Sequence, residues 1–117
     1  MAYIDGFVLA VPAAKKQAYL ESAKKFSAIF KEFGALTVVE AWGDDVPEGK
    51  LTSFTMAVQR ADDETVVFSW ITWPSKETRD AGWVKAMADP RMPNDPGAMP
   101  FDGKRMIFGG FTPIVDV

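Results

Sequence analysis

Apolar side chains are concentrated in one stretch of the chain, Thr65–Trp73, where every residue except Ser69 is β-branched or aromatic. This composition is typical of a packed β-strand. Successive side chains of a strand point to opposite faces. One face therefore carries Val66, Phe68 and Trp70, and the other carries Val67, Ile71 and Trp73. Because both faces are apolar, we expect both to be covered by other residues or by a second subunit.

Three other segments have strand patterns, and one long segment has a helical pattern. The strands are predicted at Tyr3–Val11, Leu36–Trp42 and Arg105–Val115. A helix is predicted from about Ala13 to Gly34, because apolar residues recur there at spacings of three and four, as on one side of a helix. This stripe, which we expect to be core and not a ligand site, consists of Tyr19, Ala23, Phe26, Phe30 and Phe33.

A second helix is predicted directly after the strand at Thr65–Trp73. Ser75 is a favourable N-cap residue, and the helix should run to about Ala88. Its expected inner side consists of Ala81, Val84 and Ala88, with Trp83 beside it. Residues 89–103 contain four prolines, so we expect an irregular segment that is either functional or packed over a cavity mouth.

The order of these elements is strand, helix, strand, strand, helix, strand, within a single domain of residues 1–117. This is the βαββαβ order of a ferredoxin-like α+β fold, with a four-stranded antiparallel sheet and two helices on one face. The second face of such a sheet stays open. Because that face is apolar here, we expect two copies to stack across a two-fold axis as a dimeric α/β-barrel, a homodimer.

Two glycines, Gly109 and Gly110, lie inside the last predicted strand. Glycine within a strand marks a bulge or a place where another group comes close to the backbone. A bulge is the simpler interpretation. The alternatives are an aromatic side chain from another strand, or a ligand.

Composition excludes several classes of function. The net charge is −3, the isoelectric point is about 4.9 and the basic residues are scattered, which makes nucleic acid a poor partner. The chain has no Cys and no His, so thiol nucleophiles, imidazole bases and the usual zinc sites are excluded. The acidic loop at 43–49 lacks the spacing of an EF-hand. We predict no cofactor, no metal and no membrane partner, and a cytoplasmic location.

Two carboxylates lie within apolar strands and are the first candidates for a site. Asp5 most simply lies at a strand end, in solvent or accepting backbone N–H bonds, because buried unpaired charge is rare. Glu40 shares a strand face with Val38 and Trp42. It either lines a pocket or forms an ion pair between subunits, and burial without a cation would raise its pKa.

The remaining candidates are charged residues and tryptophans near these elements. An arginine could hold an anionic substrate and a carboxylate could act as acid or base. The ordinary interpretation of Arg79 and Asp80 is a solvated helix face, and that of Arg105 is a turn with ion pairs. Trp42 and Trp70 could wall a site or anchor a dimer interface.

Three sequence blocks also carry a resemblance to a known family. They span residues 39–47, 63–70 with a sequel at 73–76, and 99–106, and read VEAWGDDVP, DETVVFSW with WPSK, and MPFDGKRM. Together with Tyr3–Gly6 and Ala88–Met92, these blocks resemble the YbaA-like family of small bacterial proteins. The resemblance covers nearly the whole chain. It implies a dimeric α/β-barrel fold and no activity, because the family is one of unknown function.

Three functions remain open from the sequence. The first is binding of a small organic molecule in a pocket lined by aromatic residues and a carboxylate, with or without cofactor-free catalysis. The second is a non-catalytic structural or regulatory homodimer. A solidly filled interior, with Asp5 and Glu40 paired to arginine or lysine, would favour this second function. The third, RNA binding, is disfavoured by the acidic charge balance.

Overall fold

The computed structural model describes residues 2–93 and 99–117. Its elements are β1 (Tyr3–Pro12), α1 (Lys16–Glu32), β2 (Thr37–Trp42), α2 (Phe54–Ala57), β3 (Glu64–Trp73), α3 (Lys76–Ala88) and β4 (Ile107–Phe111). Short 3-10 turns occupy Ala13–Lys15 and Gly103–Arg105. The last strand is therefore shorter than predicted, since Arg105 belongs to the turn before it. No helix within the described ranges is long and apolar enough to cross a membrane.

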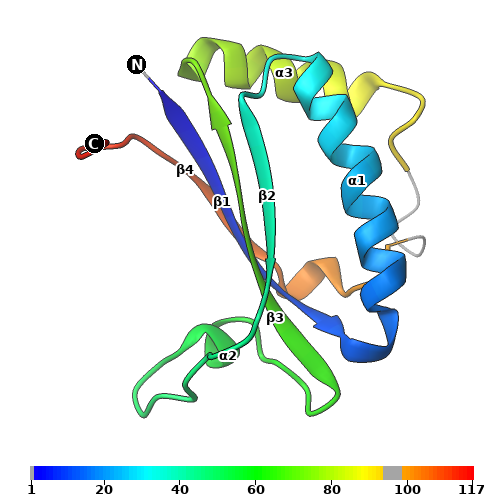
Figure 1. The fold of residues 1–117 in the computed structure, drawn as a ribbon, viewed down its shortest axis with the longest axis vertical. Helices are drawn as coiled ribbons and strands as arrows, with labels where there is room; N and C mark the ends of the chain where they lie inside the picture. The colour runs from blue at the N-terminus through cyan, green and yellow to red at the C-terminus, as the bar shows by residue number, and fades with distance from the viewer. Residues whose placement is uncertain (1, 94–98) are drawn as a thin grey trace.

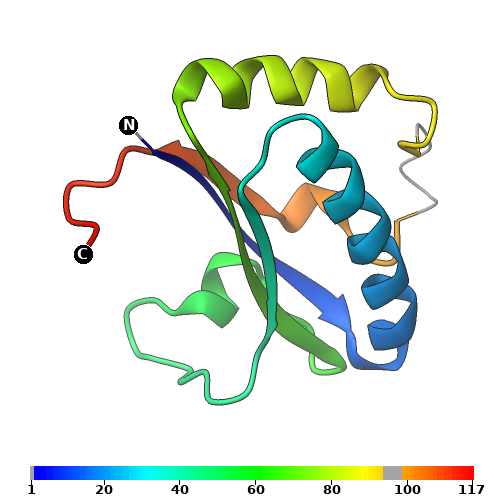
Figure 2. The same cartoon turned by 45° about the horizontal axis from the view of Figure 1, so that its top comes forward.

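The four strands form one antiparallel sheet in the order β2-β3-β1-β4, as Figure 1 shows. Both long helices, α1 and α3, lie on the same side of this sheet (Figure 2). The α+β class and the antiparallel four-stranded sheet are confirmed, and the order of elements agrees with the ferredoxin-like prediction. The short helix α2 lies within Leu51–Gln59, a stretch whose sequence is compatible with an extended or a single-turn segment, and the structure shows the single turn. Part of the predicted irregular segment, residues 94–98, lies outside the described residues.

The core between the helices and the sheet contains Ile29 and Phe30 of α1, Ile71 and Trp73 of β3, and Ala86 of α3. Within it, Phe30 packs edge-on against Trp73 with ring centroids 6.2 Å apart. These contacts hold α1 and α3 against β3 and so set the positions of the side chains between the helices and the sheet.

The predicted inner side of α3 is wrong. Val84 is 71% exposed, and Gly82 and Ala86 are the buried positions of the helix. Gly82 is the reason: a Cβ atom there would lie 2.5 Å from a ring atom of Trp73. The helix approaches the sheet along its glycine, and a hydrophobic pattern gives no signal for such a contact.

The other face of the sheet is covered only in part by the chain itself. Val58, next to α2, packs with Val8, Ala10 and Val66 and is fully buried. The chain thus supplies a small second layer that the sequence did not indicate. Beyond it the face is open in the part of the chain that the structure describes, and Phe68 is 44% exposed.

Gly109 and Gly110 do not form a bulge. They pair in regular register with Gly6 and Asp5 of β1. A Cβ atom on Gly110 would lie 2.3 Å from the hydroxyl of Tyr3, so this glycine admits an aromatic side chain from the neighbouring strand. The favoured prediction was wrong, and the alternative of a close aromatic contact holds at Gly110.

Candidate functional site

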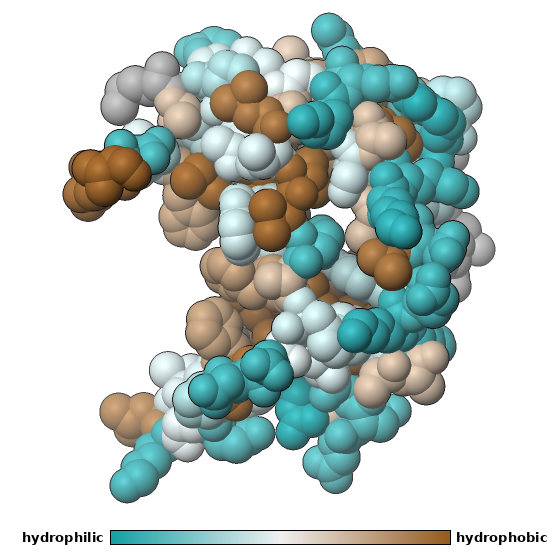
Figure 3. Space-filling model, in the orientation of Figure 1, coloured by the Kyte–Doolittle hydropathy of each residue, from teal (hydrophilic) through white to brown (hydrophobic). Residues whose placement is uncertain are grey.

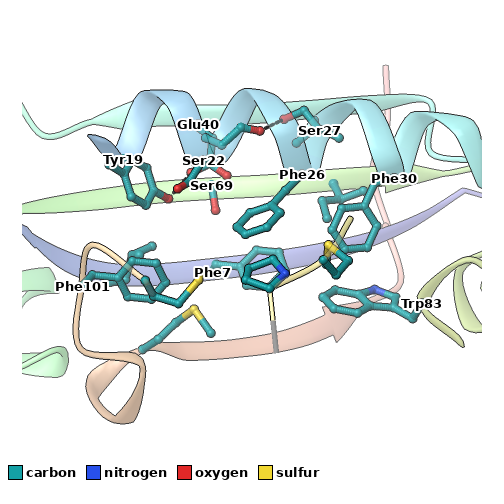
Figure 4. Close-up of a pocket in the computed structure, with 18 of the residues that line it drawn as sticks. Phe7, Tyr19, Ser22, Phe26, Ser27, Phe30, Glu40, Ser69, Trp83 and Phe101 are labelled. Carbon is teal, nitrogen blue, oxygen red and sulfur yellow. Dashed lines mark hydrogen bonds between the residues drawn. The ribbon is translucent and has the colours of Figure 1, made fainter. Parts of the chain in front are cut away.

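A cavity of about 390 Å³ lies between the two long helices and the sheet. Its wall is mainly apolar and aromatic (Figure 4). The aromatic side chains that line it are Phe7, Tyr19, Phe26, Phe30, Trp83 and Phe101. They come from β1, α1, α3 and the segment before β4, so residues from across the sequence build one space.

Polar groups gather at one end of the cavity, as Figure 4 shows. There the hydroxyl of Tyr19 donates a short hydrogen bond to Oε1 of Glu40. Ser69 is the direct cross-strand partner of Glu40, and Ser22 of α1 lines the same end. Ser27, further along α1, donates its hydroxyl to the backbone carbonyl of Ala23 at 2.6 Å.

The electrostatics of this end are dominated by one carboxylate. Glu40 is exposed as a residue, and the surrounding protein atoms desolvate its carboxylate only in part. Desolvation raises the pKa of Glu40, while hydrogen bonds from Tyr19 and Ser69 oppose that rise. Burial and the neighbouring Glu40 carboxylate raise the pKa of Tyr19. Among the described residues that line the cavity there is no Lys and no Arg.

Simple periodicity explains how these side chains meet. Val38 and Glu40 are two residues apart on β2 and therefore point to the same face. Tyr19, Phe26 and Phe30 lie on one side of α1 at helical spacing. The sheet face and the helix face then enclose the cavity between them.

Asp5 lies next to the cavity but does not line it. It is 3% exposed and is enclosed by donors. Trp73 Nε1 donates to it at 2.9 Å, Trp83 Nε1 at 2.8 Å, and Arg79 Nη2 at 2.8 Å. Asp80 is exposed and pairs with Arg79 at 2.9 Å. The simplest interpretation of Asp5, a carboxylate at a strand end in solvent or accepting backbone N–H bonds, is therefore wrong. The carboxylate is buried and accepts hydrogen bonds from side chains.

Arg105 also forms ion pairs with acidic side chains. Its two terminal nitrogens each lie 2.6 Å from an oxygen of Glu64, a side chain that is almost completely buried. The Arg105 guanidinium holds the pKa of Glu64 below its ordinary value. Arg105 also contacts Asp102 at 3.1 Å. This arrangement is the ordinary turn with ion pairs.

Neither candidate tryptophan is among the described residues that line the cavity. Trp42 is half-buried, and the Lys16 ammonium lies 5.2 Å from its ring centroid. Trp70 is on the opposite sheet face, where its ring centroid is 5.6 Å from that of Phe68. Of the seven candidate residues, Glu40 alone is among the described residues that line the cavity.

Sequence reasoning missed most residues of the site, among them Tyr19, Ser69 and Trp83. Tyr19 belongs to the stripe assigned to the core, and that stripe also forms cavity wall. Two signals were available. Tyr19 is the one residue with a hydroxyl in a stripe otherwise made of alanine and phenylalanine, and Ser69 is the one residue of the predicted strand Thr65–Trp73 that is neither β-branched nor aromatic.

Comparison with known proteins identifies the family. Residues 2–103 match a family described as "Protein of unknown function (DUF1428)". The chain belongs to this family. "Uncharacterized protein YbaA" of Escherichia coli strain K12 is 61% identical to this DUF1428 member over 116 residues, which cover 99% of each chain. The proteins of the same description from Escherichia coli O157:H7 and Shigella flexneri match to the same extent. The family resemblance seen in the sequence is confirmed.

The chemistry available at this DUF1428 site is limited and well defined. Glu40 can accept a hydrogen bond or a proton, and Tyr19 can donate one. The structure shows no group of three or more His, Cys, Asp or Glu able to hold a metal ion in residues 2–93 and 99–117. The site as described is therefore an apolar cavity with one acid–hydroxyl pair.

Proposed function

We propose that this protein binds a small organic molecule in the cavity between α1, α3 and the sheet. The observation that carries the proposal is the cavity itself, about 390 Å³ in volume and lined by aromatic side chains with Tyr19 and Glu40 at one end. Ligand sites in proteins have this volume range, a mainly apolar wall and a few placed polar groups.

The contrast between the two strand carboxylates also supports a binding site. Asp5 is paired with Arg79 and two indoles, as a structural role requires. Glu40 contacts a tyrosine hydroxyl in place of a cation and faces a space that the side chains of the described residues leave unfilled. Any turnover at this site would use Glu40 and Tyr19, which can exchange a proton with a bound molecule.

The proposal is tested by filling the cavity. Ser27 lines it and bonds only to its own helix, so Ser27→Leu adds bulk to the cavity without leaving a partner elsewhere unsatisfied. Ala28→Leu is the matched control, because this neighbouring residue faces solvent. A panel of small metabolites is screened by thermal shift, since a ligand of the folded state raises its melting temperature.

A ligand should stabilise the wild type and Ala28→Leu and have no effect on Ser27→Leu. A compound that stabilises all three proteins equally binds elsewhere. If no compound of a chemically broad panel stabilises the wild type, the cavity is not a ligand site.

We also propose that the protein forms a homodimer through the open face of the sheet. Figure 3 shows this side as concave, with apolar residues in the hollow. The hollow has a volume of about 590 Å³, and its lining includes Ile4, Phe68, Trp70, Ile107 and Phe111. Contiguous exposed apolar surface of this kind marks an interface. A second copy would bury it and complete the expected dimeric α/β-barrel.

RNA binding is not proposed. Aromatic side chains on an open sheet can stack on bases, but such surfaces also carry basic residues that contact phosphate. The residues that line this hollow include no Lys or Arg within the part of the chain that the structure describes.

A further inference from the structure

The polar end of the cavity accepts hydrogen bonds more readily than it donates them. A tyrosine hydroxyl has one proton, and that of Tyr19 is directed to Glu40. The proton of Ser27 is likewise directed to the carbonyl of Ala23. What these groups still offer a ligand is lone pairs, on the carboxylate of Glu40 and on the Tyr19 oxygen. The hydroxyls of Ser22 and Ser69 can turn either way.

The charge of this end is negative, and nearby arginines do not change that. Arg79 is bonded to Asp5 and Asp80, and Arg105 is bonded to Glu64 and Asp102. Neither is among the cavity's lining residues. A carboxylate or phosphate entering the cavity would meet Glu40 without a compensating cation, which costs free energy in a partly desolvated site.

The rest of the wall suits a flat apolar body. Six aromatic side chains line the space, and so do four of the six methionines of the chain, Met87, Met92, Met99 and Met106. Methionine is flexible and adapts to irregular shapes. Aromatic faces also attract a cationic group, so the wall does not oppose a positively charged head.

We infer that the ligand is an aromatic or similarly flat apolar molecule whose polar head donates a hydrogen bond to Glu40, an amine or a hydroxyl, and that carboxylates and phosphates are rejected. This inference rests on the proposed binding function and specifies the chemistry of its ligand. It replaces the idea that an arginine of this protein holds an anionic substrate.

Three probes with the same body test the inference: 2-naphthylmethylamine, 2-naphthylmethanol and 2-naphthoate. Affinities are measured by calorimetry at pH 8, above the ordinary pKa of a carboxyl group, so that Glu40 is ionised. We expect the amine and the alcohol to bind the wild type at least about tenfold more tightly than the naphthoate, the ratio that one charge-assisted hydrogen bond supplies.

Two variants locate the effect. Glu40→Gln should weaken binding of the amine by about tenfold, because a charge-assisted hydrogen bond is lost. It should strengthen binding of the naphthoate, because the repulsive charge is gone. Glu77→Gln removes the same charge from the exposed start of α3 and should leave all three affinities unchanged. The amide that Glu40→Gln introduces still accepts a hydrogen bond from an alcohol, so the affinity for 2-naphthylmethanol should fall less than the affinity for the amine.

The outcomes separate this inference from the proposed function. If 2-naphthoate binds the wild type as tightly as the amine does, the inference about ligand chemistry is overturned. If Ser27→Leu abolishes that naphthoate binding, the cavity is still a ligand site, and the proposed function stands. Equal loss of amine binding in Glu40→Gln and Glu77→Gln would show a general charge effect and would also overturn it. Failure of every probe and of the metabolite panel to bind would overturn both.

Discussion

Arg79 and Asp5 form an ion pair across 74 residues of sequence, and it joins helix α3 to strand β1. The Asp5 side chain is almost completely buried, while that of Arg79 is 25% exposed. The same carboxylate accepts from the indoles of Trp73 and Trp83. One acidic group therefore ties together the central strand, its neighbour β3, the helix above them and one wall of the cavity.

Removal of this carboxylate should destabilise the fold strongly. Asp5→Ala leaves the Arg79 guanidinium and two indole N–H groups without their acceptor, and breaking a buried ion pair typically costs about 3–5 kcal/mol. The free energy of unfolding is measured by urea denaturation. Asp80→Asn is the control, because Asp80 also contacts Arg79 but is exposed, and it should change that free energy little. Equal effects of the two variants would contradict the role of the buried pair.

The close approach of α3 to the sheet predicts a second destabilised variant. Gly82→Ala places a Cβ atom 2.5 Å from the Trp73 ring and 2.9 Å from the backbone oxygen of Phe33. Overpacking of this kind costs about 1–3 kcal/mol. Gly103→Ala is the matched control, since no atom lies within 4 Å of the added Cβ. If both variants unfold at the same urea concentration, the helix does not pack as closely as the structure shows.

Glu40→Gln should stabilise the protein in a pH-dependent way. Desolvation raises the pKa of Glu40 in the folded state above its ordinary value of 4.5. The stability linked to this group is then fully present below the unfolded pKa and is lost as pH rises through the folded pKa. The wild type and Glu40→Gln should have the same melting temperature near pH 4. At pH 8 the melting temperature of the variant should be higher by roughly 1–3 °C.

This result is checked by thermal melts of both proteins across that pH range. The Tyr19 hydroxyl can still donate to the amide oxygen that replaces the carboxylate, so the variant keeps the hydrogen bond. A variant that melts lower than the wild type at pH 8 would mean that the charge of Glu40 stabilises the fold, contrary to the desolvated setting described above.

Self-association should depend on the open sheet face. Phe111 is 59% exposed and lines the hollow, so Phe111→Glu places a charge where the second copy is proposed to dock. Val84→Glu introduces the same charge at a similarly exposed apolar position on α3. By sedimentation at micromolar concentration, the wild type and Val84→Glu should be dimers and Phe111→Glu a monomer. A monomeric wild type would contradict the dimer proposal.

The regular elements could be predicted because their signals are local. A strand such as Thr65–Trp73 is recognisable from its own residues, and so is the capped start of α3, where Ser75 accepts from the backbone N–H of Thr78 at 3.1 Å. The inner face of α3 could not be predicted in the same way. Gly82 is buried because of the position of Trp73, and no property of the helix alone reveals it.

The site was predictable at one residue and hidden at most others. Glu40 stands out as a charge inside an apolar strand. Tyr19 does not, because helical spacing gives the same pattern for a filled core and for the wall of a cavity. The surroundings of Asp5 were hidden for another reason: its partners are 68 to 78 residues away, and only the folded chain brings them together.

The side chains of strand β3 line both the cavity and the open hollow, one on each face of the sheet. Ser69 and Ile71 face the cavity, while Phe68 and Trp70 face the open hollow. Insertion or deletion of one residue inside this strand would exchange the two sets of side chains. Such a change would alter the proposed ligand cavity and the proposed dimer face in one step, so β3 should tolerate substitutions at single positions far better than any change in its length.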